Sequence, residues 1–381
     1  DDYQFSELIC SVSLIFIMFY GGFNTKWQSA KCVAVRATIL STLGVLVTAG
    51  LTGVFCYFVL HFSYVESFLI GAVLSSTDAA SVFSILRGKH LNLRDGTASL
   101  LEIESGSNDP MSYLLTMIGI SLLGNADTGN IPLMIFMQLA LGILVGVVVA
   151  LIGIVLLTKT NFIPEGLETI FVIAIVIFSF GLAELIGGNS YLSVYLLGIL
   201  LGNSRIRNKN ILIPFFDGVT GLAQILIFFL LGLLAFPHRM PDIMVPALLI
   251  ALFLTFVARP IAVFGILLPF RCSIRQCLLV SWAGLRGAAS IVFAIMVIAG
   301  GGDISLDLFH IVFMVALLSV AFQGTLIPKV AEKLNMVDNS ADVSKTFNDY
   351  QEESAMTLMR MYIPKGHNWE NHKICEVSIP T

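Results

Sequence analysis

Charged residues are scarce in this sequence. They make up 12% of its 381 residues, while hydrophobic residues make up 57%; a soluble globular domain carries about 25% charged residues. A chain of this composition has too little polar surface to cover its core in water, so we expect its solvent to be a lipid bilayer. The formal net charge of −4 gives no reason to expect a nucleic acid as a partner.

Motifs of redox, metal and hydrolytic chemistry are missing as well. The six cysteines are scattered without a C-x-x-C or metal-like spacing, which excludes the common zinc and thioredoxin-like patterns. No hydrolase or metal-binding signature is recognisable either, so we expect no tightly bound cofactor. The sequence has no visible signal peptide and begins with Asp1 instead of Met, so we expect both of its ends to be truncated.

Long hydrophobic runs fill most of the chain. A membrane-spanning helix needs about 20 apolar residues, and this criterion predicts eleven spans. They cover residues 7–21, 33–60, 65–86, 97–123, 132–157, 167–187, 190–202, 215–236, 244–268, 275–298 and 305–328. Alternate loops between them carry eleven Lys or Arg residues, and the remaining loops carry one. This bias follows the positive-inside rule and places the C-terminal tail in the cytoplasm.

The predicted spans form an inverted internal repeat. The first four and the last four make two sets whose starts are seven spans apart, so the sets cross the membrane in opposite directions. The third member of each set is interrupted by residues that break a helix, at 75–78 and at 284–287. Paired interruptions in inverted halves point to the binding site of a secondary transporter. The predicted fold is an all-α polytopic membrane protein with two interrupted crossing helices.

The fourth span carries carboxylates at membrane depth, where a charge costs at least about 2.5–3.5 kcal/mol. Asp109 follows Ser105 by four residues, so the two side chains share a helix face. Pro110 has no N–H, which leaves the carbonyl of Gly106 without a helical donor. Oxygens of these kinds can replace the hydration water of an alkali cation. We therefore predict an alkali cation site at Asp109 and Ser105.

The interruption at residues 75–78 supplies a second group of oxygens. Unwound backbone at membrane depth is tolerated where it lines a cavity, so the carbonyl of Thr77 is a further candidate ligand. Asp78 has two interpretations of equal weight. It is either part of the cation site or a structural group that neutralises the positive end of a half-helix.

Arg286 lies at mid-membrane and needs a carboxylate partner. We predict an ion pair with Glu104, mainly structural, which leaves Asp109 as the titrating group. Burial disfavours the charged form of a carboxylate, so Asp109 is expected to hold either a proton or a cation, but not both. That competition is sufficient for obligatory exchange.

Two other classes of function remain open on these residues alone. A channel or a solute-coupled symporter would use the same cavity, and a channel would pass ions without stoichiometric proton movement. An intramembrane aspartyl hydrolase would use Asp78 and Asp109 as a dyad. That mechanism leaves Arg286 and the inverted repeat without a role.

Three motifs carry a resemblance to a known family. They are Ser-Thr-Asp-Ala-Ala at 76–80, Leu-Glu-Ile-Glu-Ser-Gly-Ser-Asn-Asp-Pro at 101–110 and Gly-Leu-Arg-Gly-Ala at 284–288. In this order and spacing the chain resembles the NhaP-type monovalent cation:proton antiporters over essentially its whole length. The long second motif is similar to the bacterial potassium/proton antiporter branch named for cell volume regulation.

The resemblance implies a role for each site residue. Asp109 is the implied carrier of the cation and the proton, assisted by Ser105 and the Thr77 backbone. Asn108 stands where electrogenic relatives have a second Asp, which implies an electroneutral exchanger. The family also has a buried ion pair that matches the one predicted above. Potassium is the favoured cation and sodium the second choice, with cation, pH and volume homeostasis as the implied role.

The resemblance also implies the wider setting. Family members have about thirteen spans, so two helices are expected to precede this sequence. They form homodimers in the cell membrane, here the bacterial inner membrane, and a core bundle moves like an elevator. Many relatives carry an acidic residue at the position of Tyr20. That departure bears on the ion preference.

The predicted organisation has three parts. A transmembrane domain covers residues 1–330, and a polar cytoplasmic linker covers 331–355. Residues 356–381 begin with a strand-like run and resemble the start of a regulatory domain found C-terminal in potassium transport proteins. A small molecule or a nucleotide is the expected regulator of that truncated domain.

Overall fold

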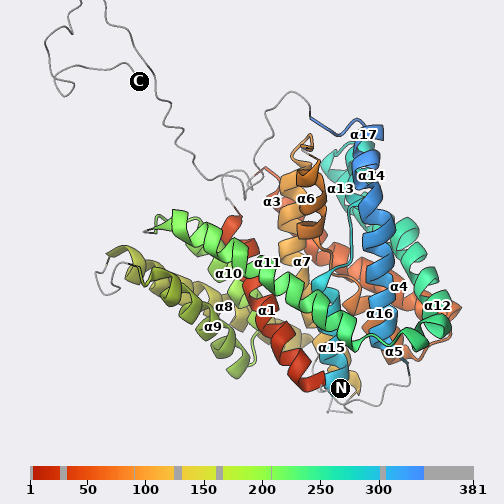
Figure 1. Cartoon of the computed structure of the whole chain (residues 1–381), viewed down its shortest axis with the longest axis horizontal. Coiled ribbons are helices and arrows are strands. Elements are labelled where there is room, and N and C mark those ends of the chain that lie inside the picture. The colour runs from red at the N-terminus through yellow and green to blue at the C-terminus, as the bar shows by residue number, and fades with distance from the viewer. Residues whose placement is uncertain are drawn as a thin grey trace, which may run out of the picture.

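The structure is a computed structural model, and it describes residues 3–25, 32–89, 91–123, 131–159, 166–206, 208–300 and 306–338. These residues fold into helices joined by short connections (Figure 1). The segment 356–381 and most of the predicted linker lie outside the described residues. The predicted all-α polytopic fold is confirmed.

The helices reproduce the predicted segments with shifted ends. Single helices are α1 (Tyr3–Asn24), α7 (Thr97–Leu123), α8 (Ile131–Lys159), α9 (Glu168–Leu185), α10 (Ser190–Gly202) and α11 (Lys209–Leu234). Helices that continue through a π-helical turn are α3 (Ala34–Ile39), η1 (Leu40–Gly44) and α4 (Val45–Val59); α12 (Met240–Phe253), η3 (Leu254–Ala258) and α13 (Arg259–Leu267); and α16 (Leu308–Leu318), η5 (Ser319–Gly324) and α17 (Thr325–Lys333). Broken segments are α5 (Tyr64–Val73) with α6 (Ala79–Gly88), and α14 (Ile274–Trp282) with α15 (Ala288–Ala299). The turns η2 (Pro237–Arg239) and η4 (Leu268–Phe270) are 3₁₀-helical.

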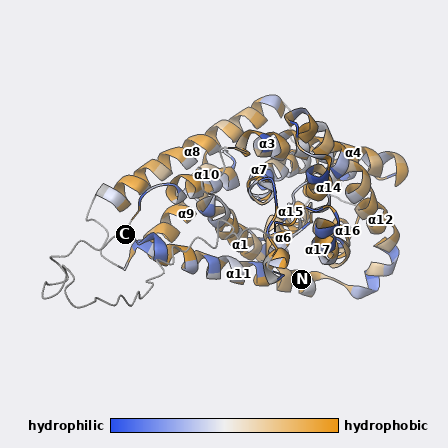
Figure 2. Ribbon diagram, turned by 90° about the horizontal axis from the view of Figure 1, so that it is seen from above, coloured by the Kyte–Doolittle hydropathy of each residue, from blue (hydrophilic) through white to orange (hydrophobic). Residues whose placement is uncertain are grey.

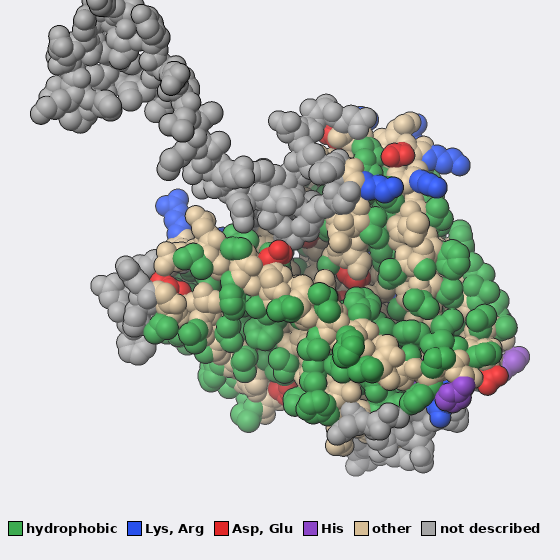
Figure 3. Space-filling model, in the orientation of Figure 1, with side chains coloured by type: hydrophobic (Ala, Val, Ile, Leu, Met, Phe, Trp, Pro, Cys, Tyr) green, Lys and Arg blue, Asp and Glu red, His purple; other side chains and the backbone are tan. Residues whose placement is uncertain are grey.

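Within the described residues, seven helical segments are long and apolar enough to cross a bilayer, and α5, α10 and α15 are shorter apolar helices. Hydrophobic residues run along most helices, and hydrophilic residues occur inside the bundle near α7 and α14 (Figure 2). Hydrophobic side chains cover the middle of the face in Figure 3, and charged side chains gather toward its two ends. This distribution is that of a multi-pass membrane protein whose middle belt faces lipid.

The helices form two bundles that meet along one interface (Figure 1). One bundle contains α3 to α7 and α12 to α17, and the other contains α1 and α8 to α11. Helices α1 and α10 approach closely because Gly22, Gly198 and Gly202 leave no side chain between the two backbones. The first bundle contacts the second mainly through α7 and α15, which pack against α1, α10 and α11.

The two breaks occur at the predicted positions and lie against each other. Residues 74–78 separate α5 from α6, and residues 283–287 separate α14 from α15. The amide of Asp78 donates a hydrogen bond of 2.8 Å to the carbonyl of Leu285. Such unwinding is favoured by serine and threonine, whose hydroxyls can hydrogen-bond to backbone groups outside a helix, and by glycine, whose backbone has the greatest conformational freedom. The crossing brings four helix ends together in the middle of the first bundle.

The end of the described chain is attached to the connection between α6 and α7. Met336 and Asp338 follow α17, and Asn92 and Arg94 lie between α6 and α7. The amide of Arg94 donates to the carbonyl of Met336, and the amide of Asp338 donates to the carbonyl of Asn92, both at 2.9 Å. Leu93 and Val337 form an antiparallel β-bridge between these segments. The residues that follow α17, up to residue 338, therefore pack against the connection between α6 and α7.

Candidate functional site

Opposite charges lie at opposite helix ends in the crossing. The Arg286 guanidinium donates from Nη1 to the carbonyls of Ser75 (3.0 Å) and Ser76 (2.7 Å), just after the C-terminus of α5. Asp78 precedes α6 and accepts hydrogen bonds from the Ser81 amide (3.1 Å) and hydroxyl (2.6 Å). A cation at a helix C-terminus and an anion at an N-terminus are both favourable. Asp78 therefore has the capping geometry of the structural alternative, and its side chain also lines the cavity described below.

Asp109 lies where α7 passes the first unwound segment. Its side chain is 8% exposed, and it accepts a short hydrogen bond from the Ser76 hydroxyl. One turn earlier, the Ser105 hydroxyl donates to the Thr77 carbonyl (2.8 Å) and accepts from the Ala79 amide (2.9 Å). The structure thus brings together Asp109, Ser105 and Thr77, the three residues predicted as cation ligands. Ser76 belongs to the predicted interruption but was missed as a neighbour of Asp109.

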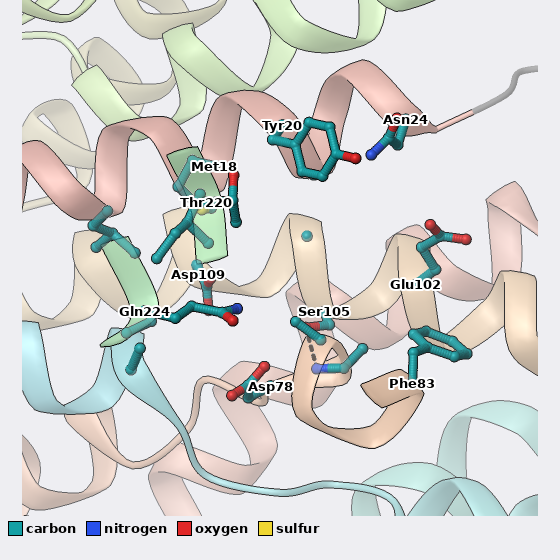
Figure 4. A pocket seen from close by; sticks show the side chains of 18 of the residues that line it. Met18, Tyr20, Asn24, Asp78, Phe83, Glu102, Ser105, Asp109, Thr220 and Gln224 are labelled. Atoms are coloured by element: carbon teal, nitrogen blue, oxygen red, sulfur yellow. Dashed lines mark hydrogen bonds between the residues drawn. The ribbon is translucent and has the colours of Figure 1, made fainter. Parts of the chain in front are cut away.

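A cavity of about 380 Å³ leads to Asp109. Asp78, Ser105 and Asp109 line it at one end, and Tyr20, Asn24 and Glu102 lie toward the other (Figure 4). The end of the cavity near Tyr20 and Asn24 lies by the C-terminus of α1. In the sequence this helix end is followed by Lys26, and α11 is preceded by Arg205. By the positive-inside rule, this end of the cavity is expected on the predicted cytoplasmic side.

Helix α11 contributes a polar stripe to the cavity that sequence reasoning missed. Asp217, Thr220 and Gln224 all line the cavity, and their spacing of three and four residues places them on one helix face. The Tyr20 hydroxyl donates to Asp217 Oδ1 at 2.9 Å. The resemblance implies a carboxylate at position 20 in many relatives. In this chain the residue at position 20 is a tyrosine, and its hydroxyl binds the Asp217 carboxylate of α11. The signal was visible as periodic polar residues within an apolar span.

The predicted ion pair between Glu104 and Arg286 is wrong, because Glu104 pairs with Arg259. Both terminal nitrogens of Arg259 donate to the Glu104 carboxylate at 3.0 Å. The two side chains are 1% and 2% exposed. Arg259 begins α13, directly after the π-helical turn η3 and before Pro260. The depth of a residue can be read from a sequence, but the side of the helix that meets a partner depends on packing.

Asn108 lies on the side of α7 that faces this ion pair. It is fully buried and donates from Nδ2 to Thr77 Oγ1 (2.5 Å) and to Glu104 Oε1 (3.3 Å). The residues that line the cavity do not include Asn108. Its contacts connect the ion pair to the unwound segment, whereas Asp109, one residue later, faces the cavity.

Of the carboxylates at the crossing, Asp109 is the one that is buried, lines the cavity and is not part of an ion pair or a helix cap. Arg259 compensates the charge of Glu104, and Asp78 caps α6. Asp109 has a hydroxyl donor from Ser76 and shares the cavity wall with Ser105 and the Thr77 residue. A carboxylate with neighbouring oxygens can bind a bare cation or a proton.

Comparisons with known proteins identify the family and the fold of the chain. The family described as the transmembrane sodium/hydrogen exchanger matches residues 2–333. The chain is 38% identical over 332 residues to the K(+)/H(+) antiporter NhaP2 of Shewanella sp. (strain MR-4), covering 85% of this chain and 57% of that protein. It is 36% identical over 336 residues to the K(+)/H(+) antiporter NhaP of Alkalimonas amylolytica, covering 87% and 58%. The chain thus spans less than two thirds of the length of these curated relatives.

A solved structure has the same fold. The sodium proton antiporter MjNhaP1 from Methanocaldococcus jannaschii at pH 8 superposes with a TM-score of 0.78 at 25% sequence identity, covering 87% of this chain and 86% of that one. The matching family and structure are transporters, which sets aside the intramembrane hydrolase. The resemblance to NhaP-type antiporters is confirmed, and the chain belongs to the sodium/hydrogen exchanger family.

Proposed function

We propose that the protein exchanges a monovalent cation for protons across the membrane, with both ions competing for Asp109. The observation that carries the proposal is the buried carboxylate at the inner end of a cavity, beside the crossing of two broken helices. Alternating access then needs only that the first bundle move against the second, so that Asp109 faces each side in turn. The name of the family and of the curated relatives supports this activity.

The charges around the site support an electroneutral stoichiometry. Glu104 is neutralised by Arg259 at bonding distance, and Asp78 is bound at the N-terminus of α6. Asp109 is then the carboxylate left to balance a transported charge. One cation in exchange for one proton keeps the charge of the moving bundle equal in both directions.

Potassium is the proposed cation, and sodium is the alternative. The two curated relatives are named potassium/proton antiporters, while the solved structure is described as a sodium proton antiporter. We propose a role in cation, pH and volume homeostasis on the same basis. The chain would work as a homodimer in the bacterial inner membrane with its C-terminus in the cytoplasm. A small molecule or nucleotide would act on the domain that begins at residue 356.

Cation-induced proton movement in proteoliposomes tests the proposal. The full-length protein is reconstituted with a trapped pH dye, and potassium, sodium and lithium are added in turn. We expect a pH change with potassium that is absent in Asp109→Asn. Asp242→Asn, which removes an exposed carboxylate in the first turn of α12, is the matched control and is expected to retain exchange.

The channel and symporter alternatives predict a different result. Isotope flux without a pH change, for every cation tested, would discard exchange and favour one of them. Full exchange by Asp109→Asn would discard Asp109 as the carrier while leaving antiport intact. A membrane potential that alters the rate would contradict the electroneutral stoichiometry.

A further inference from the structure

The second half of the inverted repeat contains a counterpart of the cation site. Residues 286–289 (Arg-Gly-Ala-Ala) end the second break and begin α15, as residues 77–80 (Thr-Asp-Ala-Ala) end the first break and begin α6. Helix α16 with η5 takes the place in the second set that α7 takes in the first. We can therefore ask what stands opposite the second break where Ser105 and Asp109 stand opposite the first.

A serine and a glutamine occupy these positions. The Ser319 hydroxyl accepts a hydrogen bond of 3.1 Å from the Arg286 amide, as the Ser105 hydroxyl accepts one from the amide of Ala79, the first residue of α6. Gln323 follows Ser319 by four residues, the same spacing that separates Asp109 from Ser105. The counterpart of the ion-carrying carboxylate is thus a neutral amide.

Gln323 uses its amide to hold the second break. It is 5% exposed, and its Nε2 donates to the carbonyl of Trp282 at 2.7 Å. Its Oε1 accepts from the Ser319 hydroxyl at 2.9 Å. In return the Trp282 indole donates to the carbonyl of Gln323 at 3.1 Å. An amide can make both the donor and the acceptor bond at once, which neither a carboxylate nor an apolar side chain can do. These contacts fix the end of α14 and the start of the second unwound segment to η5.

The second break in turn holds the first. Leu285 accepts from the Asp78 amide, and Arg286 donates to the carbonyls of Ser75 and Ser76. The Ser76 hydroxyl then donates to Asp109. A continuous series of hydrogen bonds therefore runs from Gln323 through both unwound segments to the carrier. Every protein group in it is buried or nearly so, where an unmade bond is costly.

We propose that Ser319 and Gln323 are positioning residues for the cation site, which act through the crossing and do not touch the ion. The proposal rests on the proposed function, since it concerns the affinity of Asp109 and its neighbours for a cation. Residues that hydrogen-bond to the ligands of a metal ion, without touching the ion, commonly change its affinity when they are mutated, because they fix the orientation of the ligands. The neutral amide supplies this support without adding a second negative charge opposite Arg286.

Transport kinetics of four variants test the inference in the full-length protein. Gln323→Leu is expected to raise the KM for potassium about tenfold, the lower end of the range for such partners, with kcat within about twofold. Ser319→Ala is expected to act in the same direction, and Ser319→Thr, which keeps the hydroxyl, to restore the wild-type KM. Gln138→Leu is the matched control, because Gln138 lies on α8 outside the crossing and its buried Oε1 has no hydrogen-bond partner.

A binding measurement separates this inference from the proposed function. The potassium concentration that gives half-maximal thermal stabilisation of the purified protein is compared between wild type and Gln323→Leu. A wild-type protein that exchanges ions, with an unchanged KM and binding midpoint in Gln323→Leu and Ser319→Ala, would overturn the inference alone. A lower melting temperature or kcat with an unchanged KM would assign the two residues a structural role and also overturn it. A wild-type protein that neither exchanges nor binds potassium, sodium or lithium would overturn the proposed function and the inference with it.

Discussion

Arg259 and Glu104 join two helices through a bidentate contact, with both terminal nitrogens of the guanidinium 3.0 Å from the carboxylate oxygens. The planar fork of an arginine matches a carboxylate at two points. The contact connects the first residue of α13 to Glu104 on α7, five residues before Asp109. A buried pair of this kind has little net effect on stability while complete, but the loss of one partner leaves an uncompensated charge.

Removing one partner of this pair should therefore destabilise the protein strongly. We expect Arg259→Met to lower the free energy of unfolding by about 3–5 kcal/mol, and Arg259→Met with Glu104→Met to recover most of that loss. Denaturant unfolding in detergent measures both. Arg239→Met is the control, since its pair with Asp307 is exposed at 3.4 Å and contributes at most about 1 kcal/mol. Equal stability of Arg259→Met and Arg239→Met would contradict the assignment.

The polar stripe on α11 makes a prediction about ion entry. Asp217 is exposed near the outer part of the cavity and bonded to Tyr20, so its charge raises the local cation concentration. We expect Asp217→Asn to raise the KM for potassium severalfold at low ionic strength, with kcat unchanged, because long-range attraction is screened by salt. Initial rates at two salt concentrations measure the effect, and Asp242→Asn serves as control. A change in kcat that is independent of salt would instead place Asp217 in the transport step.

Much of the architecture follows from local properties of the chain. Apolar length predicts the helical segments, and the runs at 75–78 and 284–287 predict both breaks because serine, threonine and glycine leave a helix readily. The four-residue spacing predicts that Ser105 and Asp109 share a face. These features need no knowledge of which helices are neighbours, so the sequence alone was sufficient to predict them.

The partners of the buried charges need that knowledge. Both Arg259 and Arg286 are arginines at membrane depth, and only the arrangement of the helices in space brings the first to Glu104. Arg286 instead finds the free carbonyls at the end of α5, a partner that exists only because the helix unwinds there. Asp217 was missed although its spacing from Thr220 and Gln224 was visible, because the sequence does not show that this face of α11 borders the cavity. The functional roles of Asp109, Ser105, Thr77, Asn108 and Asp78 stay predictions until transport is measured.

Close contact at the crossing makes Gly287 intolerant of any side chain. A Cβ atom at this position would overlap the Cβ, Cγ and Oδ2 atoms of Asp78. The Asp78 Cβ is bonded to the backbone, so no rotamer change can move it out of the way. We expect Gly287→Ala to lose about 1–3 kcal/mol of stability, as overpacked cores do, and most of the exchange activity. Gly265→Ala is the control, because a Cβ there meets no atom within 4 Å. Wild-type exchange by Gly287→Ala would show that the two breaks can separate without affecting the site.

His310 joins the start of α16 to the connection between α11 and α12, which links the two bundles. It is 1% exposed; its Nε2 accepts from the Phe236 amide at 2.9 Å, so a neutral ring carries its proton on Nδ1, 2.6 Å from Asp307 Oδ1. We expect His310→Phe to cost about 1 kcal/mol, because it leaves the partly buried Phe236 amide without its acceptor. Hydrogen exchange of residues 235–240 measures this locally, with the exposed His238→Phe as control. Faster exchange in His310→Phe alone would place the anchor at the ring nitrogen, since both variants put the same side chain beside the Phe236 ring. Equal protection in the two variants would mean that packing around Phe236, and not the hydrogen bond, holds the connection in place.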